Sequence, residues 1–187
     1  ELLIVQNAAL LRAAGVSDEV IQQHEQAHRA VHRCLLDGAG EDQLRAAVRK
    51  LIEVQLRTAA DGTQLGADQL DQFVAKGLAQ FRSPWMLWFL RHDPRESLRQ
   101  VKCPVLALTG ALDLQVPPRE NLPEIEKAVR GGGNRDVVVN ELPGLNHLLQ
   151  TATTGLVAEY GVIEQTLSPA ALDELTGWLQ KHFNLPS

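Results

Sequence analysis

The hydrophobic pattern changes near residue 100, and this change constrains the fold more than any other feature of the sequence. Before it, apolar residues recur at the three- and four-residue spacing of amphipathic helices. After it come two apolar runs of strand length, Cys103 to Thr109 and Asp136 to Leu142, separated by a helix-type segment. This order predicts a parallel βαβ unit and an α/β fold class, with the first strand buried on both faces.

The pattern predicts two regions, a helical one over residues 1–100 and an α/β one over residues 101–187. In the first we expect helices over 2–13, 18–36, 41–59 and 67–81, then a short aromatic helix from Pro84 and a last one after Pro94. Gly15, Asp37-Gly38 and Asp61-Gly62 would end helices, and Ser17 is the expected N-cap of the second. In the second region, helices are expected from Pro117 to about Arg130 and from Pro169 onward.

The composition excludes several classes of protein. Of the 187 residues, 44% are hydrophobic and 22% charged, which is typical of a globular protein with a real core. A net charge of −5, with Lys and Arg scattered, argues against a nucleic-acid partner. No apolar run is long enough to cross a membrane. Two cysteines, Cys34 and Cys103, suggest buried reduced thiols and not a disulfide framework.

One polar residue stands out in the loop after each predicted strand. Asp113 lies in TGALDLQVPP after the first, and His147 lies in ELPGLNHLLQ after the second. Ligands of open α/β sheets bind at the carboxyl ends of the strands. An acid after one strand and a histidine after the next is how α/β-hydrolases supply the last two members of their catalytic triad. We therefore expect Asp113 to orient His147, and His147 to act as a general base.

The same segments resemble a known family. VKCPVLALTGALDLQVPPRENLPEIEKAV, then ELPGLNHLLQTA, resemble the C-terminal part of bacterial α/β-hydrolases of the serine esterase type, which include dienelactone-hydrolase-like proteins and peptidase-like members. SPWMLWFLRHDP resembles the segment that leads from their helical cap back to the sheet. The resemblance implies a helical cap followed by the last two strands, and hydrolysis of a small-molecule ester or related acyl substrate without a cofactor.

The chain departs from this family at the nucleophile. Its serines are Ser17, Ser83, Ser97, Ser168 and Ser187, and none lies in a G-x-S-x-G elbow. The family's oxyanion-hole loop is also missing, and the chain begins at Glu1 without a Met. We therefore expect a piece of a longer protein, inactive by itself, whose localisation the sequence does not indicate. The first strand would lack its usual neighbour, so we expect a homodimer or another pairing through that exposed sheet edge.

Two alternatives come from the first half of the chain. HEQAHRAVH contains H-E-x-x-H, so His24 and His28 are weak zinc candidates of a peptidase. A catalytic zinc needs a third ligand, which a downstream Glu on another helix, such as Glu41 or Glu53, could supply. The favoured interpretation is plain residues of a cap helix, with no metal. Trp85, Trp88 and Phe89 would line an acyl pocket or fill the core. A non-catalytic helical interaction module derived from a hydrolase is the second alternative.

Overall fold

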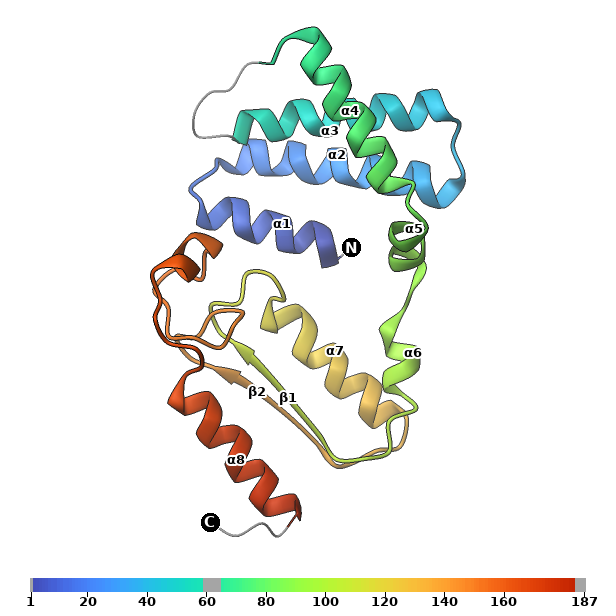
Figure 1. The fold of residues 1–187 in the computed structure, drawn as a ribbon. Helices are drawn as coiled ribbons and strands as arrows, with labels where there is room; N and C mark the ends of the chain where they lie inside the picture. The colour runs from blue at the N-terminus through green and yellow to red at the C-terminus, as the bar shows by residue number, and fades with distance from the viewer. Residues whose placement is uncertain (1, 59–64, 184–187) are drawn as a thin grey trace. The chain divides into compact units, whose positions relative to one another are not determined.

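The computed structural model describes residues 2–58 and 65–183 and divides into two compact units, one ending at His92 and the other beginning at Asp93 (Figure 1). The first unit is helical throughout, and the second contains the strands. Each unit is described by itself below. Together they show a mostly helical protein of mixed α/β class with a small parallel sheet.

The helical unit contains α1 (Leu2–Ala13), α2 (Asp18–Asp37), α3 (Glu41–Thr58), α4 (Ala67–Phe81) and α5 (Pro84–Arg91). Gly38 ends α2 in the left-handed conformation at φ 69°, as the sequence predicts. Ser17 occupies the predicted N-cap position of α2, but its side chain makes no capping hydrogen bond there. Ser83 does cap α5, because its hydroxyl accepts the N–H of Met86 at 3.2 Å. The predicted break at Asp61-Gly62 lies outside the described residues.

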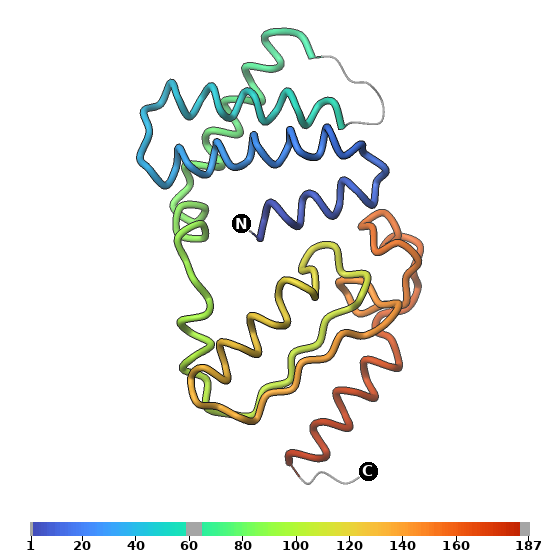
Figure 2. Tube along the Cα trace, turned by 180° about the vertical axis from the view of Figure 1, so that it is seen from behind, coloured from blue at the N-terminus to red at the C-terminus, as the bar shows by residue number. Residues whose placement is uncertain are grey.

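The core of this unit lies among α2, α3 and α4. In Figures 1 and 2, α2 and α3 run side by side and α4 crosses them at an angle. Val31, Val48 and Val74, one from each helix, are completely buried. Gly77 explains how α4 approaches α3 closely: a Cβ atom there would lie 2.9 Å from the side chain of Val48. Removing one buried methyl group costs about 0.5 to 1.5 kcal/mol and truncating a buried Leu or Ile to Ala costs about 2 to 5 kcal/mol, so this core contributes much of the stability of the helical unit.

The second unit contains α6 (Pro94–Leu98), β1 (Val105–Gly110), α7 (Pro118–Gly131), β2 (Val137–Leu142), a 3₁₀ helix (Val157–Gly161) and α8 (Pro169–Phe183). The strands are parallel, with Val105 opposite Val137 and Gly110 opposite Leu142, which confirms the predicted βαβ unit. Figure 1 shows α7 and α8 on either side of the strands. Because the strands are parallel and in register, the carboxyl ends of β1 and β2 lie next to each other.

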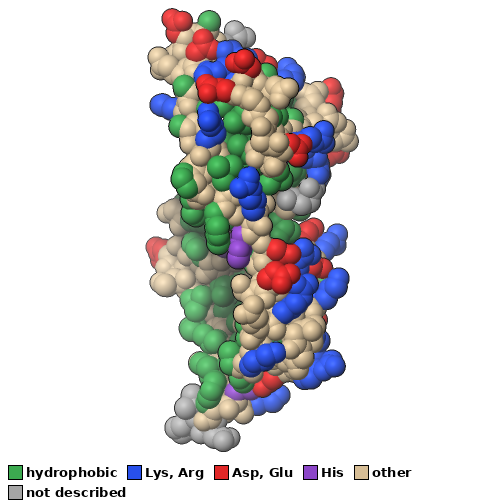
Figure 3. Space-filling model, turned by 90° about the vertical axis from the view of Figure 1, so that its right-hand side faces the viewer, with side chains coloured by type: hydrophobic (Ala, Val, Ile, Leu, Met, Phe, Trp, Pro, Cys, Tyr) green, Lys and Arg blue, Asp and Glu red, His purple; other side chains and the backbone are tan. Residues whose placement is uncertain are grey.

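The strands are less buried than the sequence predicts. In β1, Val105 to Leu108 are half-buried, and only Thr109 and Gly110 are buried, so the expectation of a strand buried on both faces is wrong. The physical reason is the size of the sheet: in the described residues it has only these two strands, so each strand keeps one open edge. In Figure 3, hydrophobic side chains gather along one flank of this unit and Lys and Arg side chains along the other.

The cysteines correct another expectation. Both are free, but Cys103 is exposed and Cys34 only half-buried, so neither is the buried thiol that the sequence suggests. Cys103 is exposed because β1 begins after it, at Val105. None of the helices within residues 2–58 and 65–183 combines the length and the apolar character needed to cross a membrane.

Candidate active site

Asp113 lies in the loop between β1 and α7 and is 5% exposed. Its Oδ1 accepts the backbone N–H groups of Gln115 at 2.9 Å and Val116 at 2.7 Å. An aspartate that binds its own backbone in this way builds the turn itself, so one carboxylate oxygen is committed to the loop. The other oxygen, Oδ2, is available for a partner.

That partner is His147, in the loop that follows β2. Its Nδ1 lies 2.9 Å from Oδ2 of Asp113. A carboxylate can only accept, so the hydrogen bond requires the proton on Nδ1 and leaves Nε2 as the acceptor nitrogen. The His147 side chain is 36% exposed, whereas that of Asp113 is 5% exposed. A buried acid thus orients an imidazole that is itself partly exposed.

The ends of the strands explain why these two loops meet. Gly110, the last residue of β1, lies against the second loop: a Cβ atom there would fall 2.1 Å from the carbonyl oxygen of Leu145. The same carbonyl accepts the N–H of Leu112 at 2.9 Å. Any larger residue at position 110 would push the loops apart. Glycine at the strand end therefore positions Asp113 and His147 as much as the two side chains do.

Sequence reasoning missed several polar residues around this pair. Gln115 donates through Nε2 to the hydroxyl of Tyr160 at 2.7 Å, which joins the Asp113 loop to the 3₁₀ helix. Asn146 and Gln150, on either side of His147, are buried and bonded to each other. Their position in GLNHLLQ, next to the candidate base, is the one signal that could have identified them.

The pair can orient and move a proton, but the described residues do not complete a triad. No hydroxyl or thiol in the described part of the chain donates a hydrogen bond to Nε2 of His147. Ser17 and Ser83 are at helix N-caps, Ser97 lies in α6, and Ser168 is buried just before α8. Ser187 lies outside the described residues. A nucleophile within reach of His147 would have to come from elsewhere.

The H-E-x-x-H histidines lie in the interior of the helical unit. His24 and His28 are 5% and 6% exposed, and their ring centroids are 4.6 Å apart on one face of α2. Burial lowers the pKa of His24, and burial together with the neighbouring His24 and His32 lowers the pKa of His28 to about 4. Both ring nitrogens of His28 are buried without a hydrogen-bond partner. These features belong to neutral core histidines.

The third ligand that a catalytic zinc requires is not found in the described residues, where no group of three or more His, Cys, Asp or Glu could hold a metal ion. Glu41 pairs instead with Arg45 at 3.2 Å and with Arg82 at 3.1 Å. Those hydrogen bonds lower the pKa of its carboxyl group.

The aromatic residues of α5 are at the surface. Trp85, Trp88 and Phe89 are 62%, 57% and 42% exposed, so they do not fill the core of the helical unit. Trp85 stacks on Phe89 with ring centroids 5.2 Å apart, and Trp88 stacks on His92 at 4.4 Å. Whether they line an acyl pocket stays a prediction.

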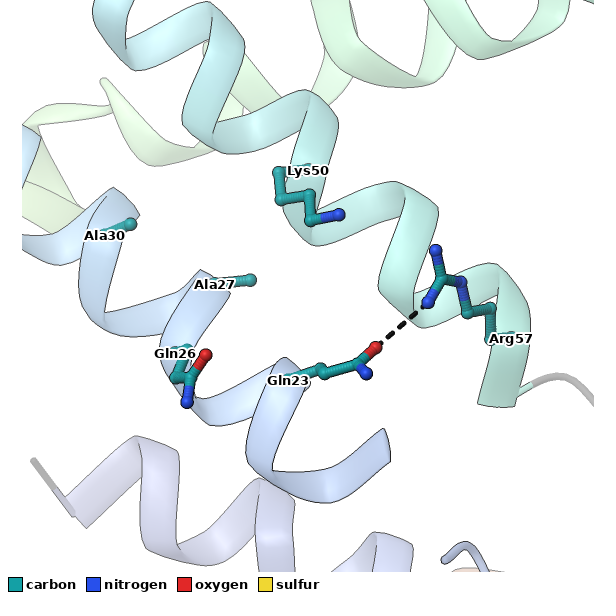
Figure 4. A pocket seen from close by; sticks show the side chains of 6 residues that line it. All are labelled: Gln23, Gln26, Ala27, Ala30, Lys50 and Arg57. Atoms are coloured by element: carbon teal, nitrogen blue, oxygen red, sulfur yellow. Dashed lines mark hydrogen bonds between the residues drawn. The ribbon is translucent and has the colours of Figure 1, made fainter. Parts of the chain in front are cut away.

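A groove between α2 and α3 is lined by Gln23, Gln26, Ala27, Ala30, Lys50 and Arg57 (Figure 4). Arg57 donates to the Gln23 side chain across it at 2.9 Å. The residues that line it include no histidine, carboxylate, hydroxyl or thiol, so the groove has no acid–base pair like that of Asp113 and His147. Comparison of the chain with family models, curated proteins and solved structures gave no match.

Proposed function

We propose that this chain supplies the acid and the general base of a serine-type α/β-hydrolase that acts on a carboxylic ester or a related acyl compound. The observation that carries the proposal is the 2.9 Å contact between His147 Nδ1 and Asp113 Oδ2, at the carboxyl ends of two adjacent parallel strands. Parallel strands concentrate functional groups at this edge. The resemblance of both loops to the serine esterases supports the same assignment.

In the proposed reaction, a serine from outside the described residues attacks the acyl carbonyl. His147 accepts the hydroxyl proton at Nε2 and later gives it to the leaving alcohol. Asp113 keeps the proton of the neutral ring on Nδ1 and stabilises the imidazolium that forms. The acyl group is carried on the serine until water, activated by the same histidine, releases the acid. His147 and Asp113 need neither a metal nor an organic cofactor for these steps.

The test is to assemble the chain with a segment that carries a strand, a G-x-S-x-G elbow and the following helix, and to measure p-nitrophenyl acetate hydrolysis. We expect turnover by the complex and its loss in the His147→Ala variant. The isolated chain should not be labelled by a fluorophosphonate. A folded complex without turnover, or stoichiometric labelling of the isolated chain, contradicts the proposal.

The proposal also concerns the open edge of the sheet. An edge strand presents unpaired N–H and C=O groups that another strand can join. The exposed edge of β1 is where the strand of the nucleophile-bearing segment would pair, and in the isolated chain we expect a second copy to cover it. Size-exclusion chromatography with light scattering should therefore give a dimer at micromolar concentration. A monomer would contradict this part of the proposal alone.

A further inference from the structure

The loop that carries His147 is closed by a buried amide. Asn146 is 0% exposed, and its Oδ1 accepts the backbone N–H groups of Leu148 and Gln150, both at 3.0 Å. Its Nδ2 donates to the side-chain Oε1 of Gln150 at 3.0 Å, and its backbone N–H donates to the Gln150 carbonyl at 3.0 Å. The bonds of one residue thus span the chain from one side of His147 to the other.

Gln150 connects this turn to the segment before α8. It is 7% exposed, and its Nε2 donates to the carbonyl of Gln165 at 2.8 Å. The Gln165 side chain in turn accepts the N–H of Thr151 at 2.6 Å. Between the two amides, Leu149 has a positive φ of 56°, which a β-carbon makes unfavourable. Tertiary hydrogen bonds must therefore hold the turn in this conformation.

His147 itself has little that holds it. Among residues 2–58 and 65–183, its ring has one hydrogen bond, the 2.9 Å contact with Asp113, and more than a third of its side chain is exposed. Where the imidazole lies is therefore decided by the backbone that carries it, and the Asn146–Gln150 network fixes that backbone. Removing one partner of a buried hydrogen bond leaves the other unsatisfied, so such a network keeps one geometry.

We propose that Asn146 and Gln150 are positioning residues of the candidate site: they hold the His147 backbone so that Nδ1 meets Oδ2 of Asp113. Their effect on a reaction rests on the proposed function, but their effect on the His147 ring does not. Asn146 and Gln150 act through the turn and do not touch the reacting atoms. In the assembled hydrolase, displacing the base by about 1 Å would lower kcat roughly 10²-fold and leave KM nearly unchanged.

The second unit offers a matched control, because it contains another buried asparagine. Asn134 is 7% exposed, and its Nδ2 donates to the carbonyls of Val101 at 3.2 Å and Cys103 at 2.8 Å. Its Oδ1 accepts the N–H of Asp136 at 2.9 Å. These bonds lie at the amino ends of the strands, so Asn134→Ala removes a comparable buried amide at the opposite end of the sheet from His147.

The experiment is ¹H–¹⁵N NMR of the histidine rings in the isolated full chain, with the thermal unfolding midpoint measured for each variant. We expect wild type and Asn134→Ala to show the Nδ1–H proton of His147 bonded to a carboxylate and a single ring tautomer. Asn146→Ala should lose that proton signal and mix the tautomers, although both alanine variants lower the midpoint. An unchanged His147 ring in folded Asn146→Ala, or an equal change in Asn134→Ala, overturns the proposal.

If Asn146→Ala does not fold, Gln150→Glu provides the second variant. It keeps the Oε1 acceptor for Asn146 but replaces the Nε2 donor to Gln165 by an oxygen. A weakened Nδ1–H signal of His147 is expected, and an unaltered one in the folded variant again overturns the proposal. Because the ring is observed without substrate, an inactive assembled complex with the expected NMR result would contradict only the proposed function.

Discussion

His147 in the second unit and His28 in the helical unit show how surroundings decide what a histidine can do. The Nδ1 atom of His147 lies 2.9 Å from the carboxylate of Asp113, and 36% of the His147 side chain is exposed. His28 is 6% exposed, and neither of its ring nitrogens has a hydrogen-bond partner. The familiar catalytic string, H-E-x-x-H, contains the buried histidine whose ring nitrogens have no hydrogen-bond partner. The proposed catalytic base lies in GLNHLL, which matches no short motif.

The difference is one of charge compensation. A carboxylate beside one ring nitrogen stabilises the imidazolium that forms when the other nitrogen accepts a proton. The neighbours of His28 are two further imidazoles, so a proton there would be buried without compensation, and its pKa falls to about 4.

The largest effect should follow from Asp113→Asn in the assembled hydrolase. Asparagine can keep the Oδ1 bonds to Gln115 and Val116, but its NH₂ group would face Nδ1 of His147 and favour the wrong tautomer. We expect kcat for p-nitrophenyl acetate to fall by about 10³- to 10⁴-fold. His28→Leu, in contrast, should leave kcat nearly unchanged, because the His28 side chain is buried within the helical unit. A variant Asp113→Asn that retains a tenth of the activity would remove the basis of the comparison.

His28→Leu should produce the next largest effect, on stability. The folded pKa of His28, about 4, lies below the unfolded value of 6.5, so between these pH values the unfolded state binds the extra proton. Stability is therefore lost as the pH falls through 6.5 toward 4, by about 2 kcal/mol at pH 5. His24, whose pKa is also lowered, adds to the loss. Leucine at position 28 does not titrate, so the variant should lose less stability at low pH by the amount that His28 contributes.

Urea unfolding followed by far-UV circular dichroism at pH 7 and pH 5 measures this. The control is Gln22→Leu, which adds leucine to an exposed position of the same helix without removing a titrating group. Gln22→Leu should keep the wild-type loss between the two pH values, and His28→Leu should reduce it. Equal losses in wild type and His28→Leu would show that the ring is not buried in its neutral form.

Most of the fold could be predicted because local patterns determine it. Helix α4 begins at Ala67 and ends at Phe81, as the sequence predicts. Strand β1 begins two residues later than its apolar run, at Val105. The Asn134 side chain donates hydrogen bonds to the carbonyls of Val101 and Cys103, just before β1 begins. These bonds join residues about thirty positions apart, so no local sequence pattern indicates them. The 3₁₀ helix at Val157–Gly161, which has no apolar periodicity, was not predicted.

Some residues of the candidate site could likewise be predicted from the sequence, and others could not. Asp113 and His147 could be found because the ends of parallel strands meet at one edge, which is a rule of topology. Asn146 could not, because its significance depends on Gln150 and on the segment before α8. For His24 and His28, the helical spacing predicts only that both side chains lie on one face of α2. Whether their ring nitrogens have hydrogen-bond partners depends on how the other helices pack against that face, which local spacing does not determine.

The smallest effect should come from a third histidine, His182, whose pKa is raised and not lowered. In α8, His182 is hydrogen-bonded through Nε2 to Asp136 at 2.9 Å and through Nδ1 to the carbonyl of Trp178 at 2.9 Å. Both partners are acceptors, so only the protonated ring satisfies both, and these hydrogen bonds raise the pKa of His182. Stability from this contact is present below the unfolded pKa of 6.5 and is lost as the pH rises through the folded pKa.

His182→Ala should therefore destabilise the chain more at pH 6 than at pH 8.5, and by less than the His28 effect because the contact is exposed to solvent. Urea unfolding of wild type and variant at the two pH values gives the difference. Added salt should weaken the effect at pH 6, since it screens the pair with Asp136. A larger loss at pH 8.5 would mean that the neutral ring makes the contact. The sign of a histidine's effect on stability would then not follow from its partners, which is the claim that His28 and His182 support together.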